Sequence, residues 1–500
     1  MKKRILAFFL SSIMAFSMAA CGGSSADKSN NESGEGEEGV SKLVVAIRTF
    51  GTTPADLEEV QEKVNEITRE KIDVEIEMMI IPSGSYQQQM TLMLSGDEQL
   101  DVMGAPSMLI PSACASEQLK PLDDLLEEHG QGIKETLGEE LLSCGEFEGQ
   151  MYCVPIMCDQ VTGMGGFILR KDICEKYNID VETIDSYEKL GEVFEMVHEK
   201  EPNMTILSPY SVGQSPLMFN STWDKLGDYF GVLEDYGQSM EVVNLFETDA
   251  YRQYLDVFHD WYEKGYISSD VTNATEAGAA LMKAGNLFAY TQCGKPGIEI
   301  QEKNSSGYEV EYCQVLESLN VTKDQWQWTI PENSVNPEKA MEFLNLMYTE
   351  PEITNLLAYG IEDKHYIKME DGTIGYPDGV DAANSGYNMG NMVWSLGNEF
   401  HAYIWNGNDP DVWEQTIEWN KTGMKSKAFG FRYNNVSVSN EIAAVQNVYD
   451  QYRMSLECGV SDPNEVLDEM NEKLYAAGLQ TIIDEKQKQL DKWASENGVE

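Results

Sequence analysis

The chain has 500 residues, of which 42% are hydrophobic and 10% are aromatic, so it can form large hydrophobic cores. Its 85 Asp and Glu residues against 35 Lys and Arg residues give a formal net charge of −50. This balance argues against a nucleic-acid partner, because phosphates are bound by clustered Lys and Arg. A chain of this length is expected to contain roughly two to four domains.

Residues 1–21 have the three parts of a secretory signal. Three basic residues precede an apolar run at 5–16, and small residues stand directly before Cys21. The apolar run is shorter than the about 20 residues that a membrane-spanning helix needs. The residues before Cys21 resemble a bacterial lipobox, with Met18 in place of the more usual leucine. That resemblance implies cleavage and diacylation at Cys21; an ordinary signal peptide with an incidental cysteine is the alternative.

Residues 22–42 are expected to form a flexible linker. The stretch 22–40 is rich in Gly, Ser, Asn and Glu and has almost no apolar residue, so it cannot bury enough surface to fold. Two acyl chains hold a protein stably on a membrane. A doubly acylated Cys21 would therefore keep the folded part near the membrane, within reach of the linker.

An α/β pattern begins at residue 43. A short apolar strand at 43–47, an amphipathic helix after Pro54 and an alternating strand at 74–80 predict a βαβ unit. A helix at 86–95 and a strand at 101–103 bring the count to three parallel strands. Ligand-facing loops are expected beyond the C-terminal ends of these strands. The loops are 48–53, 81–86 and 104–107.

A hairpin turn at 148–151 leads to 155–166, where the chain is expected to cross to a second α/β unit. Gly163, Gly165 and Gly166 in this stretch are interpreted as a hinge and a turn. The sequence GMGG lacks the full GxGxxG spacing of a phosphate-binding loop. A new strand is predicted to start at residue 167.

The stretch 325–365 predicts a strand followed by two helices, and we interpret it as a return to the first unit. Trp326, Trp328 and Ile330 alternate with polar residues, which is typical of a strand. The alternation puts both tryptophans on one face, where core packing and ligand contact are about equally expected.

Local signals mark the ends of the two helices. Asn336 before Pro337 predicts an N-cap with proline in the first turn. Thr349 with Glu352 predicts a capping box for the second helix, which Gly360 is predicted to end. After the second helix the chain is rich in aromatic residues, and long amphipathic helices are then predicted over 440–493.

Several segments carry a family resemblance. They are NPEKAMEFLNLMYTEPEITNLLAYGIEDKHY at 336–366, LDVMGAP at 100–106, GFILRKDICEKYNID at 166–180, YLDVFHDWYEKGYISSDV at 254–271 and the helical end at 440–493. They resemble the extracellular solute-binding proteins of ATP-driven importers, family 1, in the subgroup with an extra C-terminal domain. The resemblance implies an α/β fold with two lobes, of the periplasmic-binding-protein type II, and a helical C-terminal extension. In family terms lobe 1 is 43–156, lobe 2 is 157–324, the return segment of lobe 1 is 325–375, and lobe 2 with the additional domain is 376–500.

Eight cysteines remain besides Cys21. No pair of them stands two residues apart and no histidine cluster accompanies them, so neither a metal site nor a cofactor is expected. Buried thiols are the preferred interpretation, and Cys144 with Cys153 is the pair expected to form a bridge if one exists.

At 406–411 Pro410 breaks the spacing of a calcium loop, so a polar turn is expected there.

No catalytic signature is found. His198 and Glu199 begin an HExxH pattern, but Pro202 occupies the place of the second histidine. The abundance of carboxylates guarantees close pairs, so no catalytic pair is inferred from it. The protein is therefore expected not to be an enzyme; a surface glycoside hydrolase is the competing class.

A saccharide receptor needs flat aromatic faces and fixed polar groups that bond hydroxyls. Candidates come from the predicted loops between the lobes, each with a structural alternative. For Trp394, the core that joins the extra domain to a lobe is the preferred interpretation, and Asp101 could equally cap the following turn. The candidate ligand residues are Tyr86, Asp101, Asp159, Tyr210, Trp223, Trp326, Trp394 and Arg432.

The expected function is that of a solute receptor, lipid-anchored through Cys21 on the outer face of the cytoplasmic membrane of a Gram-positive bacterium. The resemblance implies separate permease subunits as partners. An oligosaccharide is the first expectation for the ligand, and a peptide or a charged glycan is the alternative. Closure of the lobes over the ligand would shift an existing open and closed equilibrium.

Overall fold

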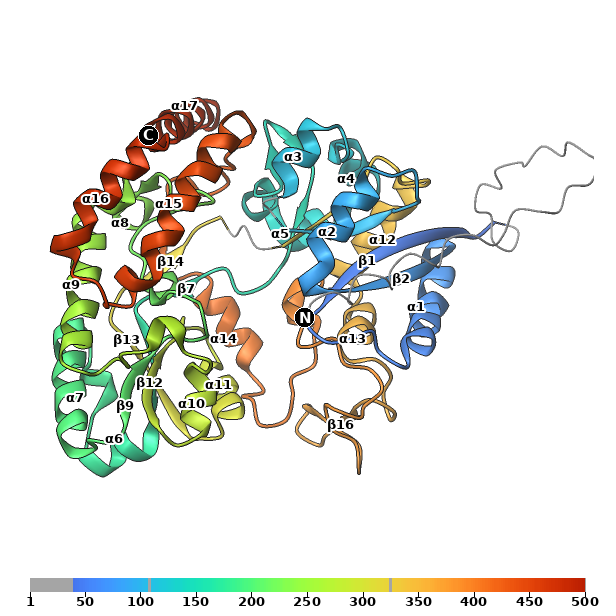
Figure 1. Ribbon diagram of the computed structural model, residues 1–500. Helices are drawn as coiled ribbons and strands as arrows, with labels where there is room; N and C mark the ends of the chain where they lie inside the picture. Colours follow the sequence, from blue (N-terminus) through green and yellow to red (C-terminus); the bar gives the residue numbers. More distant parts are fainter. Residues whose placement is uncertain (1–38, 107–108, 323–325, 500) are drawn as a thin grey trace, which may run out of the picture.

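The computed structural model describes residues 39–106, 109–322 and 326–499. Figure 1 shows two bodies side by side: lobe 1 carries β1 and α1, and lobe 2 carries α6, α7 and β12. The predicted signal, Cys21 and most of the predicted linker fall in 1–38, outside the described residues. Within the described ranges, no helix combines the length and the apolar character needed to cross a membrane.

A five-stranded sheet in the order β2-β1-β3-β15-β6 forms the centre of lobe 1. β1 is parallel to β2 and to β3, which confirms the three predicted parallel strands. The later strand β15 enters the same sheet antiparallel to β3 and β6. The bounds are β1 Ser41–Thr49, β2 Val74–Pro82, β3 Val102–Ala105, β6 Val154–Pro155 and β15 Gln327–Thr329.

The helices of lobe 1 pack around this sheet, with α12 against α4, α5 and α13, and α13 against α1. Asn336 caps α12 as predicted, since its Oδ1 accepts a hydrogen bond from Lys339 N at 3.2 Å. The predicted capping box is wrong: Thr349 is the last residue of α12, and its hydroxyl donates back to Asn345 O. The bounds are α1 Leu57–Ile72, α2 Ser83–Leu94, α3 Ile110–Ala115, α4 Asp123–His129, α5 Gln131–Ser143, α12 Pro337–Thr349 and α13 Pro351–Tyr359.

Lobe 2 contains a four-stranded sheet in the order β13-β8-β12-β9. β12 is parallel to β9, whereas β8 is antiparallel to both β12 and β13. The strands are β8 Gly166–Arg170, β9 Thr205–Ser208, β12 Leu287–Thr291 and β13 Val310–Gln314. The helices are α6 Lys171–Tyr177, α7 Tyr187–Lys200, α9 Asp249–Glu263, α10 Gly278–Lys283 and α11 Ile298–Ser306.

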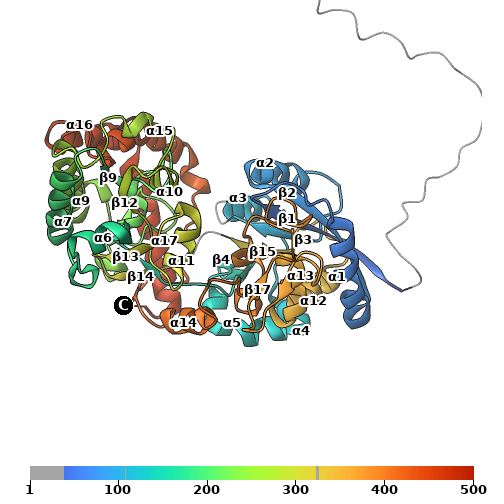
Figure 2. The same ribbon diagram turned by 90° about the horizontal axis from the view of Figure 1, so that it is seen from below.

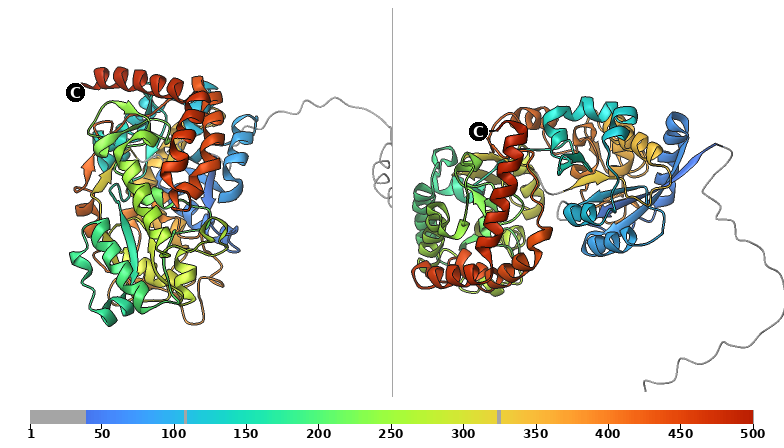
Figure 3. Two further views of the ribbon diagram at one scale, coloured as in Figure 1. Left: turned by 60° about the vertical axis from the view of Figure 1, so that its left-hand side comes forward. Right: turned by 90° about the horizontal axis from the view of Figure 1, so that it is seen from above.

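Three C-terminal helices, α15 (Ser439–Glu457), α16 (Pro463–Ala476) and α17 (Leu479–Asn497), form a layer on lobe 2. Figure 3 shows them in red against the green part of that lobe. The core of lobe 2 joins both regions, because buried residues of 167–313 and 428–490 form one hydrophobic cluster. The helical extension is therefore packed on lobe 2 by a shared apolar core.

The core of lobe 1 extends further along the chain than the predicted boundary at residue 375. Its hydrophobic cluster contains residues of 43–158 and of 326–396, and Tyr387, Met392 and Leu396 are all buried in it. The aromatic stretch after 375 packs on lobe 1 because its large side chains complete that core. Residues 376–396 are thus part of lobe 1 and not of lobe 2.

Three segments connect the two clusters, and we call 159–166, 314–322 and 397–427 the crossing segments. Their strands β7 (Thr162–Gly163), β14 (Ser318–Asn320) and β18 (Met424–Lys425) pair in the order β18-β14-β7. Seen from below in Figure 2, α14 (Val412–Trp419) of the third segment lies between the lobes. Pairing among three separate stretches of backbone gives the connection a defined geometry.

Close packing at the first crossing requires glycine. A β-carbon added to Gly166 would lie 2.0 Å from Gln292 O, and one added to Gly165 would lie 2.6 Å from the Leu316 side chain. Gly165 also has a φ of +64°, which side-chain-bearing residues rarely adopt. These glycines permit a close backbone approach, as expected for a turn.

Cys144 and Cys153, the pair expected to form a bridge if one exists, are not joined by a disulfide, and Cys153 is a buried thiol. Burial raises the pKa of the Cys153 thiol to about 12, so it stays protonated and unreactive at neutral pH. This agrees with the expectation of buried structural thiols.

Candidate functional site

The C-terminal ends of strands from both lobes converge on the crossing segments, and we call this region the junction. In Figure 1, β1 starts at the far edge of lobe 1 and runs toward lobe 2. In lobe 2, the loop after β12 reaches the first crossing, where Gly163 and Gly294 exchange two backbone hydrogen bonds of 2.9 Å. Gly165 N also donates to Phe219 O in the loop after β9, at 2.7 Å. Ligands of open α/β sheets bind beyond such strand ends.

Four residues of lobe 1 form the Arg48 cluster at the end of β1: Arg48, Phe50, Trp326 and Trp394. The guanidinium carbon of Arg48 lies 4.0 Å from the ring centroid of Trp326, 5.1 Å from that of Phe50 and 5.2 Å from that of Trp394. The rings of Phe50 and Trp394 are 6.5 Å apart with an interplanar angle of 31°. Phe50 is 57% exposed, so the cluster presents an aromatic face to solvent.

Buried contacts in lobe 1 hold the Arg48 cluster in place. Tyr86 packs on Trp326 at 5.0 Å between ring centroids, and its hydroxyl donates to Gly104 O at 2.7 Å. Trp328 Nε1 donates to Ser395 O at 2.9 Å, which fixes the backbone directly after Trp394. The aromatic face is therefore supported by the lobe 1 core rather than by a mobile loop.

The cluster is also tied to the junction through the backbone. Met157 N donates to Gly397 O at 2.8 Å, and Glu399 N donates to Met157 O at 2.8 Å. Gly397 follows Trp394 by three residues, so the chain that carries Trp394 is bonded to the chain that enters the first crossing. A movement of one lobe relative to the other would therefore shift the position of the Trp394 ring.

Lobe 2 presents an aromatic and apolar surface at the same region, in the loop after β9. Tyr210 is half-buried and packs edge-to-face on Phe219, with 5.7 Å between ring centroids. Val212 and Met218 of the same loop are 53% and 46% exposed. Exposed apolar side chains in a loop that is bonded to the crossing are suited to cover a ligand.

A polar group lies where the first and third crossing segments meet the loop after β12. Lys295 Nζ lies 3.6 Å from Asp159 Oδ2. Burial acts to lower the pKa of Lys295, but the charges of Asp159 and Glu399 raise it overall. Cys158, Asp159 and Glu399 each offer one ligand atom within 4.8 Å of the others, as a metal site would. Because the Lys295 ammonium already supplies positive charge beside Asp159, we assign the group to ion pairing between the first crossing segment and the loop after β12.

Asp101 is placed inside lobe 1 rather than at the junction. It is fully buried, and both of its carboxylate oxygens accept hydrogen bonds. Oδ2 accepts from Val44 N at 2.8 Å, and Oδ1 accepts from Val335 N at 2.9 Å and from Ser334 Oγ at 2.8 Å. Asp101 thus joins β1 to the segment before α12, a role that its position at a strand end did not reveal.

The other predicted ligand residues divide into two groups. Tyr86 and Trp223 are 2% and 3% exposed and belong to the cores of lobe 1 and lobe 2. Arg432 donates to Cys144 O and to Gln327 Oε1, so it joins the C-terminal region to lobe 1. Trp326, 4% exposed, belongs to the core of lobe 1 and supports the Arg48 cluster from within. The residues that the structure brings to the junction are Asp159, Tyr210 and Trp394.

Arg48 and Phe50 were not among the predicted ligand residues. Both stand in the loop 48–53 that the strand pattern placed at a ligand-facing edge. The sequence signal that could have identified them was a cation and an aromatic residue at the end of a parallel strand. Their contact with Trp326 and Trp394 depends on chain segments far away in the sequence.

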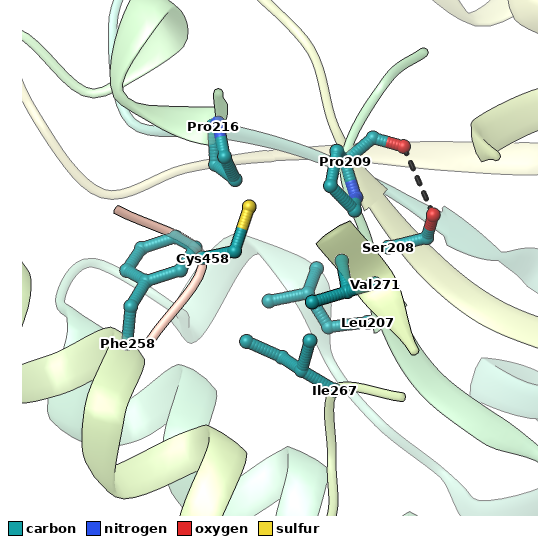
Figure 4. A pocket seen from close by; sticks show the side chains of 8 residues that line it. All are labelled: Leu207, Ser208, Pro209, Pro216, Phe258, Ile267, Val271 and Cys458. Carbon is teal, nitrogen blue, oxygen red and sulfur yellow. Dashed lines mark hydrogen bonds between the residues drawn. The ribbon is translucent and has the colours of Figure 1, made fainter. Parts of the chain in front are cut away.

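Two hollows formed by the described residues lie away from the junction. Figure 4 shows a gap inside lobe 2 between side chains that include Phe258, Ile267 and Cys458, too small to hold a water molecule. Ser208 Oγ donates to Pro209 O at 3.0 Å at its edge. A groove of about 330 Å³ lies on lobe 2 between residues that include Asp180, Lys189 and Met196. The first is a packing defect, and the second is a surface groove next to α7.

The family of the chain follows from a sequence comparison. Residues 51–353 match the model of the bacterial extracellular solute-binding proteins. The chain belongs to this family. This span contains β2, β3, β15 and the whole sheet of lobe 2. Residues 427–495, which include α15, α16 and α17, match a domain of unknown function.

Relatives of this solute-binding protein cover nearly its whole length. It is 27% identical to a carbohydrate ABC transporter substrate-binding protein of Streptococcus pneumoniae, over 97% of this chain and 98% of the relative. Among solved structures, an N-glycan transport solute-binding protein of Streptococcus pneumoniae superposes with a TM-score of 0.79 at 24% identity, over 92% of this chain and 99% of that one. An extracellular solute-binding protein of Bifidobacterium longum subsp. infantis gives 0.66 at 15% identity, over 90% and 98%.

These likenesses confirm the predicted fold. The solute-binding protein has the two-lobed type II architecture with a helical C-terminal extension. Family membership makes it a binding protein of a transport system, as the resemblance implied.

Proposed function

We propose that this solute-binding protein captures an oligosaccharide at the junction and delivers it to the permease of an ABC importer. The Arg48 cluster is the observation that carries the proposal. Phe50 and Trp394 offer two neighbouring rings, tilted by 31° to each other, at a strand end, and Phe50 is 57% exposed. The loop with Tyr210 is bonded to the first crossing segment through Phe219 O. Aromatic faces of this kind pack on the apolar faces of sugar rings.

The energetics of such a site are sufficient for capture. An aromatic face that covers on the order of 100 Å² of apolar sugar surface contributes roughly 2.5 kcal/mol. Two such faces and several hydrogen bonds of roughly 1 kcal/mol each reach a micromolar dissociation constant, about −8 kcal/mol, after the costs of ordering. Relatives named for carbohydrate and N-glycan transport agree with this ligand class.

The transport step follows from the two lobes. Contacts made by a ligand from Phe50 and Trp394 on one side and from Tyr210 on the other favour a closed form over an open one. The three crossing segments bend in that motion, and the closed form is what the permease recognises. No bond chemistry is part of this function.

The membrane anchor is also part of the proposal. Cys21 follows a secretory signal, and a linker of about twenty residues separates it from the folded part. Diacylation at Cys21 holds the receptor on the outer face of the cytoplasmic membrane of a Gram-positive cell. Replacing it, Cys21→Ala, is expected to move the protein from the membrane fraction into the medium and to abolish palmitate labelling; retention at the membrane without Cys21 would contradict the anchor.

The ligand class is tested by a thermal-shift screen of the purified protein against glycans and peptides. A ligand at one hundred times its dissociation constant stabilises the folded state by about 2.7 kcal/mol. We expect shifts with oligosaccharides and none with peptides. A response to peptides alone would replace the oligosaccharide with the alternative ligand, and turnover of a glycoside panel would point to the competing enzyme class.

A further inference from the structure

The side chain of Arg48 has no carboxylate partner among the described residues, whereas four other described arginines do. Arg69, Arg170, Arg252 and Arg453 each form an ion pair with Asp or Glu. Arg48 forms neither an ion pair nor a hydrogen bond with any described residue, and its Nε is buried without an acceptor. In a chain with 85 carboxylates, this isolation requires that the surrounding residues are uncharged.

The surroundings of Arg48 are aromatic. The three rings of the Arg48 cluster flank its guanidinium, and Tyr86 lies close enough to interact with it electrostatically. Burial lowers the pKa of Arg48, and no carboxylate raises it. An arginine remains charged under these conditions, so the cluster contains a cation whose hydration is reduced and whose charge is not neutralised.

The guanidinium of Arg48 is only partly covered, since the residue is half-buried. Nε is covered, but the terminal nitrogens of Arg48 are not among the buried polar atoms without partners, and they have no acceptor within the described chain. Trp326 Nε1 is a second buried donor of the cluster that lacks an acceptor. Lobe 1 therefore offers donors and positive charge next to an aromatic face.

We propose that Arg48 binds a carboxylate of the ligand, so that the oligosaccharide carries an acidic sugar. This inference rests on the proposed function and names the ligand class more narrowly. The planar guanidinium donates two parallel hydrogen bonds to a carboxylate, and Phe50 and Trp394 contact the apolar face of the sugar ring. The net charge of −50 does not prevent this contact, because salt screens charges over about 8 Å under physiological conditions.

The test compares ligands that differ only in the carboxylate. Calorimetric titration would measure the dissociation constants of two ligand pairs. The first pair is a sialylated N-glycan and its desialylated form, and the second is an oligogalacturonate and its methyl ester. The two pairs distinguish a sialic acid from a uronic acid as the source of the charge. We expect the acidic member of at least one pair to bind about 10-fold to 100-fold more tightly, with a preference that falls as salt is raised.

Two variants connect the preference to Arg48. Arg48→Gln removes the charge and is expected to bring the ratio of the two dissociation constants in each pair close to one. Arg48→Lys keeps the positive charge but lacks the planar guanidinium that donates two parallel hydrogen bonds. It is expected to retain part of the preference for the acidic glycan. Arg453→Gln, which alters an arginine paired with Asp450 on α15, is the matched control and should change nothing.

The possible outcomes distinguish the role of Arg48 from the proposed function as an oligosaccharide receptor. Equal or weaker binding of the acidic member, or a preference that survives in Arg48→Gln, overturns the role of Arg48 and leaves the oligosaccharide receptor intact. Binding of no glycan together with binding of peptides overturns both. Circular dichroism and the thermal midpoint of each variant show whether a lost preference reflects lost folding.

Discussion

Trp326 lies across Gly104 so closely that a β-carbon added to Gly104 would come within 2.2 Å of the indole ring. The glycine on β3 thus leaves the space in which the ring of Trp326 packs between Tyr86 and Arg48. This one contact joins the parallel strands of lobe 1 to the returning strand and supports the aromatic face at the junction.

Gly104→Ala is expected to displace Trp326, because a ring held by backbone on one side has little room to move. Overpacking of this kind destabilises a protein by about 1–3 kcal/mol. Urea denaturation would measure the loss, and tryptophan fluorescence would report the altered ring environment. Gly84→Ala is the control, since no atom lies within 4 Å of the added carbon at that position in α2. Equal stability of both variants would show that the ring tolerates the displacement.

Phe50→Ala is expected to weaken ligand binding without unfolding the protein. The ring is 57% exposed, so its removal leaves no cavity in the core. Loss of an aromatic face that covers a sugar costs roughly 2 kcal/mol, which is about a 30-fold loss of affinity. Calorimetric titration with a glycan found in the screen measures it. Leu92→Ala removes an equally exposed side chain from α2, and a comparable loss of affinity there would count against a specific role for Phe50.

Asp101→Asn separates a structural role from a ligand role. Val44 N and Val335 N donate to different oxygens of the carboxylate, and the amide nitrogen of asparagine cannot accept one of these two hydrogen bonds. Leaving a buried donor unpaired and losing the charge costs about 3 kcal/mol of unfolding free energy. Chemical denaturation should show this loss while the dissociation constant of the glycan stays the same. The exposed Asp97→Asn is the control, and a variant that loses affinity but keeps its stability would restore Asp101 as a ligand residue.

Glu457 predicts a pH dependence of the C-terminal region. Tyr251 and Tyr449 donate to its Oε1 at 3.2 Å and 2.6 Å in a fully buried setting. Burial raises the pKa of Glu457 from 4.5 to about 7. The folded state therefore keeps a proton that the unfolded chain releases above pH 4.5, so its stabilising effect is complete below pH 4.5 and is lost as the pH rises through 7.

Denaturation from pH 4.5 to 8 tests this sign. The unfolding free energy of the wild type relative to Glu457→Gln is expected to fall by on the order of 3 kcal/mol across this range. Glutamine does not titrate, so the variant should lack this component. Glu472→Gln alters an exposed carboxylate on α16 and should follow the wild type. A pH-independent difference between wild type and Glu457→Gln would mean that the carboxyl group titrates normally.

Sequence patterns specified the local architecture. Alternation and helical periodicity depend on neighbours a few residues apart, so they predicted the parallel strands β1, β2 and β3 and the cap at Asn336. The quoted segments also led to the right family and fold. The same reasoning placed the loop of Arg48 and Phe50 at a ligand-facing edge, although it did not select these two residues.

Tertiary structure decided what each side chain does. Asp101 and Trp394 both stood in predicted ligand-facing stretches, yet one is bonded inside lobe 1 and the other joins the Arg48 cluster. Their partners, Val335 for Asp101 and Arg48 for Trp394, are hundreds of residues away, and local periodicity contains no information on such pairs. Burial and pairing are properties of the packed whole, so only the folded chain separates a core residue from one that meets a ligand.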